Sequence, residues 1–378
     1  MQPKPVLQTK PHLTVTWHDN QSPAVGYLAV HDLVDGIATG GCRMRPGCTL
    51  REVEDLAYAM STKSAAFDLP VGGAKGGIDF DPKDDRSDGV LLRFIDAMRP
   101  FLERTWVTAE DLGVSQHVLD AQFEKAGLGP SSYHAQISRS PDRDATLHRV
   151  EEAMGATTQD GLVCDLIGGY GVAQAAAATL SELGDTPEST TMAVQGFGTI
   201  GGSTALYAQH LGITVVAVSD ALGTVYNPDG LDIPAMLATR NEWGEFDRSG
   251  LSAGTEELPR DALLGLTVDV LVPAAVSYAL TAHNHDQVNA RIVVEGANAA
   301  ATHEAELELA VRDIPVVPDF IANAGAVAWA WWILLDEDDD VYGRLRNEMF
   351  TLVKKVLTPW LLDGTMPRQT ALSLAMRG

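Results

Sequence analysis

A glycine-rich segment places the strongest constraint on the fold of this chain. The run 191–195 is apolar and strand-like, and it leads into the pattern G-x-G-x-x-G at 196–201. A helix over 203–210 and a strand over 213–219 are expected to follow, and that strand ends at Asp220. In a dinucleotide-binding βαβ unit, the glycines allow a tight turn and close approach of the pyrophosphate, and the acid accepts from the adenosine ribose. The segment therefore predicts an α/β domain that binds a dinucleotide.

A second glycine-rich segment, residues 70–78, surrounds Lys75 with four glycines and apolar neighbours. Glycines let backbone or ligand come close, and a water-poor setting favours the neutral amine. Such a lysine approaches the pKa that a proton-transfer group needs near neutral pH. The structural alternative is a tight glycine turn with a bystander lysine.

Two further charged residues stand in informative places. A capping box at 49–52 opens a helix that runs to about Phe67, and Lys63 falls on its apolar face. That lysine either extends its ammonium to solvent at the edge of the apolar face or is a buried cation that needs an anion. Asp111 follows a strand expected at 105–108, which is a common place for a catalytic carboxylate, and a helix N-cap is the alternative.

Composition predicts a soluble enzyme. The chain has 378 residues with 45% hydrophobic content, enough for two domains, and its formal charge of −24 argues against a nucleic-acid partner. The longest apolar run, 320–335, is too short to span a bilayer. The N-terminus has no apolar signal core and only three cysteines occur, so we expect reduced thiols in the cytoplasm. The histidines show no metal-ligand spacing, so no metal is expected.

The domain organisation follows from these segments. We expect a substrate-binding and oligomerisation domain over 1–160, and a Rossmann domain over 161–336 built from alternating helices and strands. Residues 337–378 are helical in pattern and are expected to pack back on the first domain, with Pro359 and Pro367 as breaks.

Six short motifs then form a specific set. They are Gly72-Gly73-Ala74-Lys75-Gly76-Gly77 with Lys63 upstream, Thr108-Ala109-Glu110-Asp111, Val194-Gln195-Gly196-Phe197-Gly198, Asp269-Val270-Leu271-Val272-Pro273-Ala274-Ala275, Glu295-Gly296-Ala297-Asn298 and Asn323-Ala324-Gly325. Together they resemble the glutamate/leucine/phenylalanine/valine dehydrogenase family. The resemblance implies reversible oxidative deamination of an L-amino acid with a nicotinamide cofactor, an active site in a cleft between the two domains, and a homo-oligomer.

The resemblance also implies roles for individual residues. Lys63 would hold the substrate α-carboxylate, Lys75 would be the catalytic lysine, and Asp111 would move a proton to and from the amino group. The implied substrate-binding residues are Gly40, Gly41, Lys63, Ala109, Asn323, Val327 and Ala330. The implied cofactor-binding residues are Gly196, Phe197, Gly198, Thr199, Ile200, Gly201, Asp220, Ala274, Asn298 and Asn323.

Two positions bear on the substrate side chain. Glutamate dehydrogenases carry a lysine where this chain has Thr39, and a serine where it has Ala330. Because Val327 and Ala330 stand at i+4 and i+7 from Asn323, all three are expected on one helix face. An acidic substrate would lose a countercharge and a hydroxyl, so we predict a branched or aromatic hydrophobic L-amino acid. The nucleotide-domain motifs are closer to the glutamate branch, so glutamate dehydrogenase stays as an alternative.

Two more points complete the predictions. Asp220 would repel a 2′-phosphate, and 219–227 contains no Arg or Lys to neutralise one, so NAD is expected, with NADP as the alternative. The family's threonine before a Gly-Tyr-Gly-type turn is replaced by Gly168, and 127–160 departs from the family pattern. Both departures leave open a nucleotide-binding protein with lost or repurposed activity.

Overall fold

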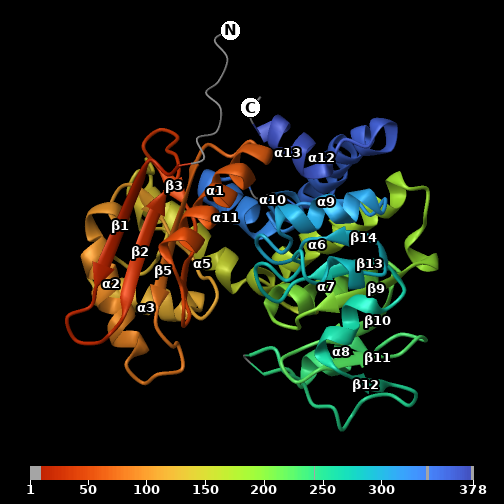
Figure 1. The fold of residues 1–378 in the computed structure, drawn as a ribbon. Coiled ribbons are helices and arrows are strands. Elements are labelled where there is room, and N and C mark those ends of the chain that lie inside the picture. The colour runs from red at the N-terminus through yellow and green to blue at the C-terminus, as the bar shows by residue number, and fades with distance from the viewer. Residues whose placement is uncertain (1–9, 242, 338–339, 376–378) are drawn as a thin grey trace. The chain divides into compact units, whose positions relative to one another are not determined.

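The chain divides into two compact units in a computed structural model that describes residues 10–241, 243–337 and 340–375 (Figure 1). The first unit contains the described residues up to Glu152 together with Trp331–Glu337. The second contains Ala153–Ala330 and the C-terminal residues through Leu374. The division thus lies between Glu152 and Ala153 rather than at 160/161.

The first unit is built on a six-stranded mixed sheet in the order β1-β2-β5-β3-β6, with β4 also paired to β5. Its strands are β1 Leu13–His18, β2 Val25–Val30, β3 Ala38–Thr39, β4 Cys42–Met44, β5 Gly72–Asp79 and β6 Trp106–Val107. Its helices are α1 Leu50–Ala66, α2 Ser87–Leu102, α3 Gln116–Lys125, α4 His134–Ile137 and most of α5 Arg143–Gly155. Helix α1 packs on β5 and β2.

The glycine-rich segment around Lys75 is a buried strand, β5, and not a tight turn. It pairs antiparallel with β2 and parallel with β3 and β4. A Cβ at Gly76 would lie 2.4 Å from the Trp106 ring, and one at Gly73 would lie 2.2 Å from the backbone nitrogen of Ser61 on α1. The glycines are therefore needed because a helix and a buried tryptophan press directly on this strand.

The second unit is a doubly wound domain with a seven-stranded sheet in the order β12-β11-β10-β9-β13-β14-β15. The strands are β9 Thr191–Gln195, β10 Thr214–Ser219, β11 Thr224–Tyr226, β12 Glu256–Leu258, β13 Val268–Pro273, β14 Ala290–Val294 and β15 Val316–Val317, and a small pair is formed by β7 Thr157–Thr158 and β8 Gly161–Leu162. The helices are α6 Val163–Glu182, α7 Thr199–His210, α8 Ile233–Ala238, α9 His303–Val311, α10 Asp319–Ala322, α11 Gly325–Leu335, α12 Val341–Asp363 and α13 Pro367–Ala375, of which α11 ends in the first unit. Five strands run parallel in the expected βαβ manner. The two-domain α/β fold is confirmed.

Gly168 belongs to the long helix α6 and not to a turn. A Cβ there would lie 2.6 Å from Cδ1 of Ile200, and one at Gly169 would lie 2.0 Å from Oγ of Ser203. These glycines therefore let α6 and α7 pack closely, which corrects the expected Gly-Tyr-Gly-type turn. Among the described residues, α6 is the helix long and apolar enough to cross a membrane, and most of it is buried inside the protein.

The C-terminal segment differs from the sequence prediction in one respect. Pro359 does not break the chain, because α12 continues through it to Asp363 and ends at Gly364, whose φ is 77°. Helix α12 packs along α6 of the second unit, and the described residues 340–374 are grouped with that unit, whereas Glu337 and Ala375 are grouped with the first. The expected packing of 337–378 on the first domain stays a prediction. The tail 376–378 and residues 338–339 lie outside the described residues.

Candidate active site

In the first unit, Lys75 and Asp111 form a buried ion pair. Lys75 Nζ donates to Asp111 Oδ1 at 2.7 Å, and the lysine side chain is 3% exposed. Strand β5 carries Lys75, and Asp111 begins a turn after β6 that Val114 closes by two backbone hydrogen bonds. The structure therefore brings together the two residues that the resemblance identified as catalytic.

The electrostatics of this pair favour an ionised carboxylate beside a lysine that loses its proton easily. Burial lowers the pKa of Lys75, and the neighbouring charge of Arg43 lowers it further, while Asp111 opposes both effects. Burial alone would raise the pKa of Asp111, but the charges of Lys75 and Arg43 outweigh it and lower that pKa. A carboxylate thus fixes the lysine, and the lysine releases its proton more readily than an exposed lysine does.

Sequence reasoning missed Arg43, which is the second cation on Asp111. Its Nε donates to Asp111 Oδ2 at 2.6 Å, and its NH1 donates to Glu52 Oε1 at 2.5 Å. The expected capping box is only half present: Thr49 accepts from the backbone nitrogen of Glu52, but the Glu52 side chain binds Arg43 and Arg45. The sequence feature that could have identified Arg43 is its position directly after Cys42, on the strand β4 that pairs with the strand of Lys75.

The expected substrate-binding residues of the first unit lie on the same sheet. A Cβ at Gly40 would lie 1.7 Å from the oxygen of Ala74, and one at Gly41 would lie 2.4 Å from the oxygen of Glu110. Ala109 accepts the backbone hydrogen bond of Cys42 at 3.0 Å. These close approaches draw the turn after β3 against the strand of Lys75 and the loop of Asp111.

Lys63 and Thr39 are both buried in this unit. Lys63 in α1 is 4% exposed, so it is a buried cation rather than one that extends to the edge. Thr39 is also buried, and its hydroxyl donates to the oxygen of Val107 at 3.3 Å. Position 39 therefore carries a small, neutral side chain whose hydroxyl is bonded to the backbone.

In the second unit, the glycine loop has the geometry that a pyrophosphate requires. Gly196 has a φ of 93°, and a Cβ at Gly201 would lie 2.0 Å from the oxygen of Gly196. A Cβ at Gly198 would meet nothing within 4 Å, and Gly198 precedes α7 as an N-cap without a side-chain cap hydrogen bond. Thr199 and Ile200 open α7, so their amides lie in its first turn, where an anion is favoured.

Asp220 ends β10 as predicted, but it already has a cation as its partner. Arg248 donates to it twice, NH2 to Oδ1 at 2.6 Å and NH1 to Oδ2 at 2.9 Å. Oδ1 also accepts from the amides of Leu222 and Gly223, so Oδ2 keeps the remaining acceptor position. Sequence reasoning missed Arg248 because it lies beyond the 219–227 segment and reaches β10 only through the tertiary fold.

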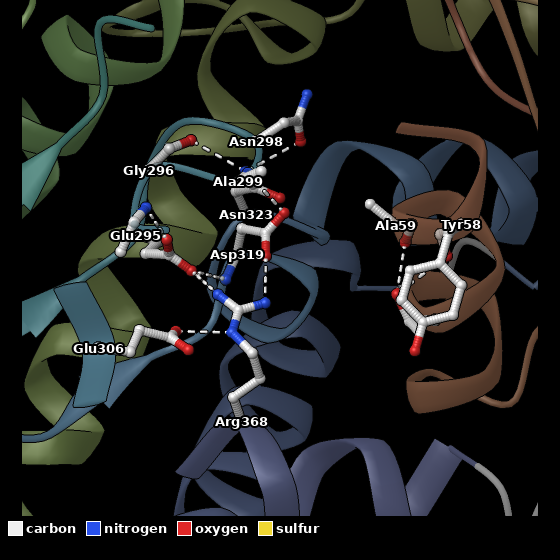
Figure 2. A network of polar contacts seen from close by, with 12 residues as sticks. Tyr58, Ala59, Glu295, Gly296, Asn298, Ala299, Glu306, Asp319, Asn323 and Arg368 are labelled. Carbon is white, nitrogen blue, oxygen red and sulfur yellow. Dashed lines mark hydrogen bonds and ion pairs between the residues drawn. The ribbon is translucent and has the colours of Figure 1, made fainter. Parts of the chain in front are cut away.

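Asn323 lies beside the loop that follows β14 (Figure 2). Its Nδ2 donates to the oxygen of Gly296 at 3.0 Å and to Oδ1 of Asn298 at 3.2 Å. Its own Oδ1 is buried and has no hydrogen-bond partner among the residues that the structure describes, although the residue is 8% exposed. A buried unpaired acceptor is costly, and a carboxamide N–H of nicotinamide would satisfy it. Ala274 lies on the neighbouring strand end, where its amide donates to Gln195.

Asn323, Val327 and Ala330 do not share one helix face. Asn323 is the C-cap of α10, and α11 begins only at Gly325. The backbone turns between the two helices, so the i+4 and i+7 spacing from Asn323 does not describe a continuous helix. Val327 and Ala330 do lie on α11 and are half-buried.

A Rossmann unit with a fitting glycine loop, in one chain with a buried Lys–Asp pair, defines a nucleotide-dependent oxidoreductase. Two family models match the chain: Glutamate/Leucine/Phenylalanine/Valine dehydrogenase over residues 165–376, and Glu/Leu/Phe/Val dehydrogenase, dimerisation domain, over 9–126. The chain belongs to this family, whose members are NAD(P)-dependent amino acid dehydrogenases.

Individual relatives agree with that assignment. The chain is 34% identical over 353 residues to a glutamate dehydrogenase of Thermotoga maritima, covering 89% of this chain and 81% of the relative. It is 35% identical to an NADP-specific glutamate dehydrogenase A1 of Halobacterium salinarum, covering 78% and 68%. The hetero-hexameric glutamate dehydrogenase of Thermus thermophilus, solved in a Leu-bound form, superposes with a TM-score of 0.78 at 28% identity, covering 97% of this chain and 88% of that one.

Proposed function

We propose that this chain catalyses the NAD-dependent oxidative deamination of a hydrophobic L-amino acid, branched or aromatic, and the reverse reductive amination. The amino acid, NAD⁺ and water give a 2-oxo acid, ammonium and NADH. The observation that carries the proposal is the buried Lys75–Asp111 pair in a chain with a cofactor-compatible glycine loop. A site with lost activity would have no physical reason to keep two buried lysines.

The chain's own residues can perform each proton step. Lys63, a buried lysine of the first unit, binds the substrate α-carboxylate by a charge-assisted hydrogen bond. Bound NAD⁺ supplies a hydride acceptor for the Cα–H bond, which leaves an imine on the substrate. Neutral Lys75 takes a proton from the water that attacks the imine carbon, and its ammonium then stabilises the resulting oxygen. Asp111 carries the proton between the substrate nitrogen and solvent.

The charges around the adenosine ribose favour NAD. Asp220 and Glu257 surround Arg248, whose Nε lies 3.4 Å from Glu257 Oε2. Two carboxylates against one guanidinium leave a net negative charge, which disfavours a 2′-phosphate.

The substrate side chain is argued from two positions. Thr39 is buried with its hydroxyl bonded to the backbone, and Ala330 has no polar side-chain atom. A substrate carboxylate beside either residue would be desolvated without a partner from that residue, at a cost of several kcal/mol. Sequence identity to relatives mainly reflects the shared fold, whereas substrate specificity depends on the few side chains at the site. These two residues therefore support an apolar substrate.

Glutamate is the second candidate, and a specific observation favours it. The relatives with 34–35% identity are glutamate dehydrogenases by name, and they cover most of this chain. If glutamate is the substrate, another cation must replace the lysine that glutamate dehydrogenases carry at the position of Thr39.

Purified protein assayed for NADH formation with each L-amino acid, with NAD and NADP in parallel, tests the proposal. We expect turnover on leucine, valine or phenylalanine and none on glutamate. The double variant Thr39→Lys/Ala330→Ser is expected to gain glutamate activity by at least about tenfold, because it restores a charge-assisted hydrogen bond and a hydroxyl. Wild-type turnover on glutamate alone would establish the second candidate. Cofactor binding without turnover on any amino acid would indicate a repurposed site.

The assembly is also part of the proposal. The family model over 9–126 is described as a dimerisation domain, and the Thermus thermophilus relative is a hetero-hexamer. We propose that this chain forms a homo-oligomer through its first unit, which sedimentation or light scattering tests directly.

A further inference from the structure

Arg368 on α13 lies at the centre of three carboxylates in the second unit (Figure 2). Its Nε donates to Glu306 Oε1 at 2.6 Å, its NH1 to Asp319 Oδ1 at 3.2 Å, and its NH2 to Glu295 Oε2. The three carboxylate side chains are 0–2% exposed. Each of the three guanidinium nitrogens thus binds a different element: α9, α10 and the end of β14.

Two of these carboxylates also hold the loop that follows β14. Asp319 Oδ2 accepts from the amide of Ala299 at 2.9 Å, and Glu295 Oε1 accepts from the amide of Ala301 at 2.6 Å. Ala299 has a φ of 48°, which an alanine adopts only when its surroundings impose it. The loop conformation therefore depends on the placement of Glu295 and Asp319.

The same two carboxylates connect to the unsatisfied acceptor. Glu295 Oε2 accepts from the amide of Asp319 at 2.8 Å, and the amide of Asn323 donates to the oxygen of Asp319 at 2.9 Å. Asn323 in turn bonds Gly296 and Asn298 of the loop. A continuous set of hydrogen bonds thus joins Arg368 to Asn323, whose Oδ1 lacks a partner within the described part of the chain.

We propose that Arg368 is a positioning residue for the nicotinamide half of the cofactor, acting through Asp319 and Glu295 on the 296–301 loop and on Asn323. The inference rests on the proposed function, because it assumes that a nicotinamide dinucleotide binds the second unit. Arg368 itself does not touch the cofactor.

A merely structural ion cluster is the competing explanation. Buried ion pairs are often no more stabilising than apolar packing, so stability alone does not explain three acids around one arginine. Truncation of Arg368 would in either case leave buried carboxylates uncompensated. The test therefore needs a readout that separates the nicotinamide half of the ligand from its adenine half.

The experiment compares NADH and ADP binding by titration calorimetry in the full-length protein and its Arg368→Met and Arg368→Lys variants. ADP carries the adenine half but no nicotinamide. For Arg368→Met we expect the Kd for NADH to rise about tenfold or more, as for loss of charge-assisted hydrogen bonds, and the Kd for ADP to stay within about twofold. Arg368→Lys keeps the positive charge but lacks the planar guanidinium with its several N–H donors. Its Kd for NADH is expected to lie between those of the wild type and Arg368→Met.

Two variants serve as controls. Glu306→Gln removes the one carboxylate that does not hold the loop, so NADH binding is expected to stay within about twofold of the wild-type value. Arg291→Met breaks a comparable ion-pair set, with Asp185 and Asp269, at the start of β14 rather than at its end. Its NADH affinity is expected to be unchanged.

The outcomes are distinct. Equal NADH affinity of Arg368→Met and wild type, or an equal loss for NADH and ADP, overturns the inference. If Arg368→Met does not fold, the binding of NADH and ADP is compared in Asp319→Asn instead. This variant keeps an acceptor for the Ala299 amide and weakens the contact with Arg368. Failure of the wild-type protein to bind NADH contradicts the proposed function instead. In an active enzyme, Arg368→Met is further expected to raise KM for NAD more than it lowers kcat.

Discussion

Replacement of Lys75 by methionine tests the catalytic assignment most directly. Methionine keeps most of the side-chain volume of the strand position, which is 3% exposed, and removes the ammonium 2.7 Å from Asp111. The first unit carries this residue, and the second carries the glycine loop. Turnover and cofactor binding should therefore respond differently.

The expected loss can be estimated from the two roles of the lysine. Removal of a group that stabilises a developing oxyanion costs about 10²–10³ in kcat, and removal of a general base costs about 10²–10⁴. Because one residue performs both roles, we expect kcat to fall by at least about 10⁴. Loss of the charged hydrogen bond to Asp111 costs roughly 1.5–3 kcal/mol of stability. Burial of a lysine is itself unfavourable, so the net destabilisation is smaller.

The assay is NADH formation with the best substrate, together with the Kd for NADH and a thermal unfolding curve. Lys83→Met, an exposed lysine on the turn after β5, is the matched control and should keep full activity. A Lys75→Met enzyme that retains more than about a tenth of the wild-type kcat refutes the assignment. A parallel loss of NADH binding would show that the variant has damaged the fold rather than the chemistry.

Three further predictions follow from the charged residues. Arg43→Gln removes a cation that lowers the pKa of Lys75, so the pH–rate profile should move to higher pH and kcat at neutral pH should fall; an unchanged profile contradicts the pairing. Burial and two nearby acids raise the pKa of Glu295 to about 8, although Arg368 opposes them, so the folded state releases this proton less readily than the unfolded state. Denaturant titrations should therefore show stability falling by up to roughly 1.4 kcal/mol per pH unit between about pH 5 and 8, and Glu295→Gln should flatten that fall. Asp220→Ser leaves Arg248 available for a 2′-phosphate, so the ratio of kcat/KM for NADP to that for NAD should rise at least about tenfold; a constant ratio means that Arg248 does not face the ribose.

Local sequence patterns were sufficient to predict the elements that carry the candidate site residues. The glycine spacing at 196–201, the strand before it and the acid after β10 all depend on neighbours close in sequence, and the structure places them as expected. Lys75 and Asp111 were identified separately, by glycine context and by strand position. Their 2.7 Å contact joins β5 to the loop after β6, so it needed the tertiary fold.

Tertiary structure decided the charge partners and the helix breaks. The partners Arg43 on Asp111, Arg248 on Asp220 and Arg368 on Glu295 are separated by 68, 28 and 73 positions in the chain, so no local pattern pairs them. The helix pattern after Asn323 was continuous in sequence, yet the backbone turns there.

The family and the two-domain α/β fold could be predicted from short motifs alone, and so could the candidate catalytic residues. These follow from turns, strands and motifs of a few consecutive residues. Which cation neutralises each buried carboxylate, and where helix α12 packs, depend on contacts between segments that are far apart in the chain. Burial makes an unpaired charge costly, so the fold must bring a partner from wherever the chain can supply one.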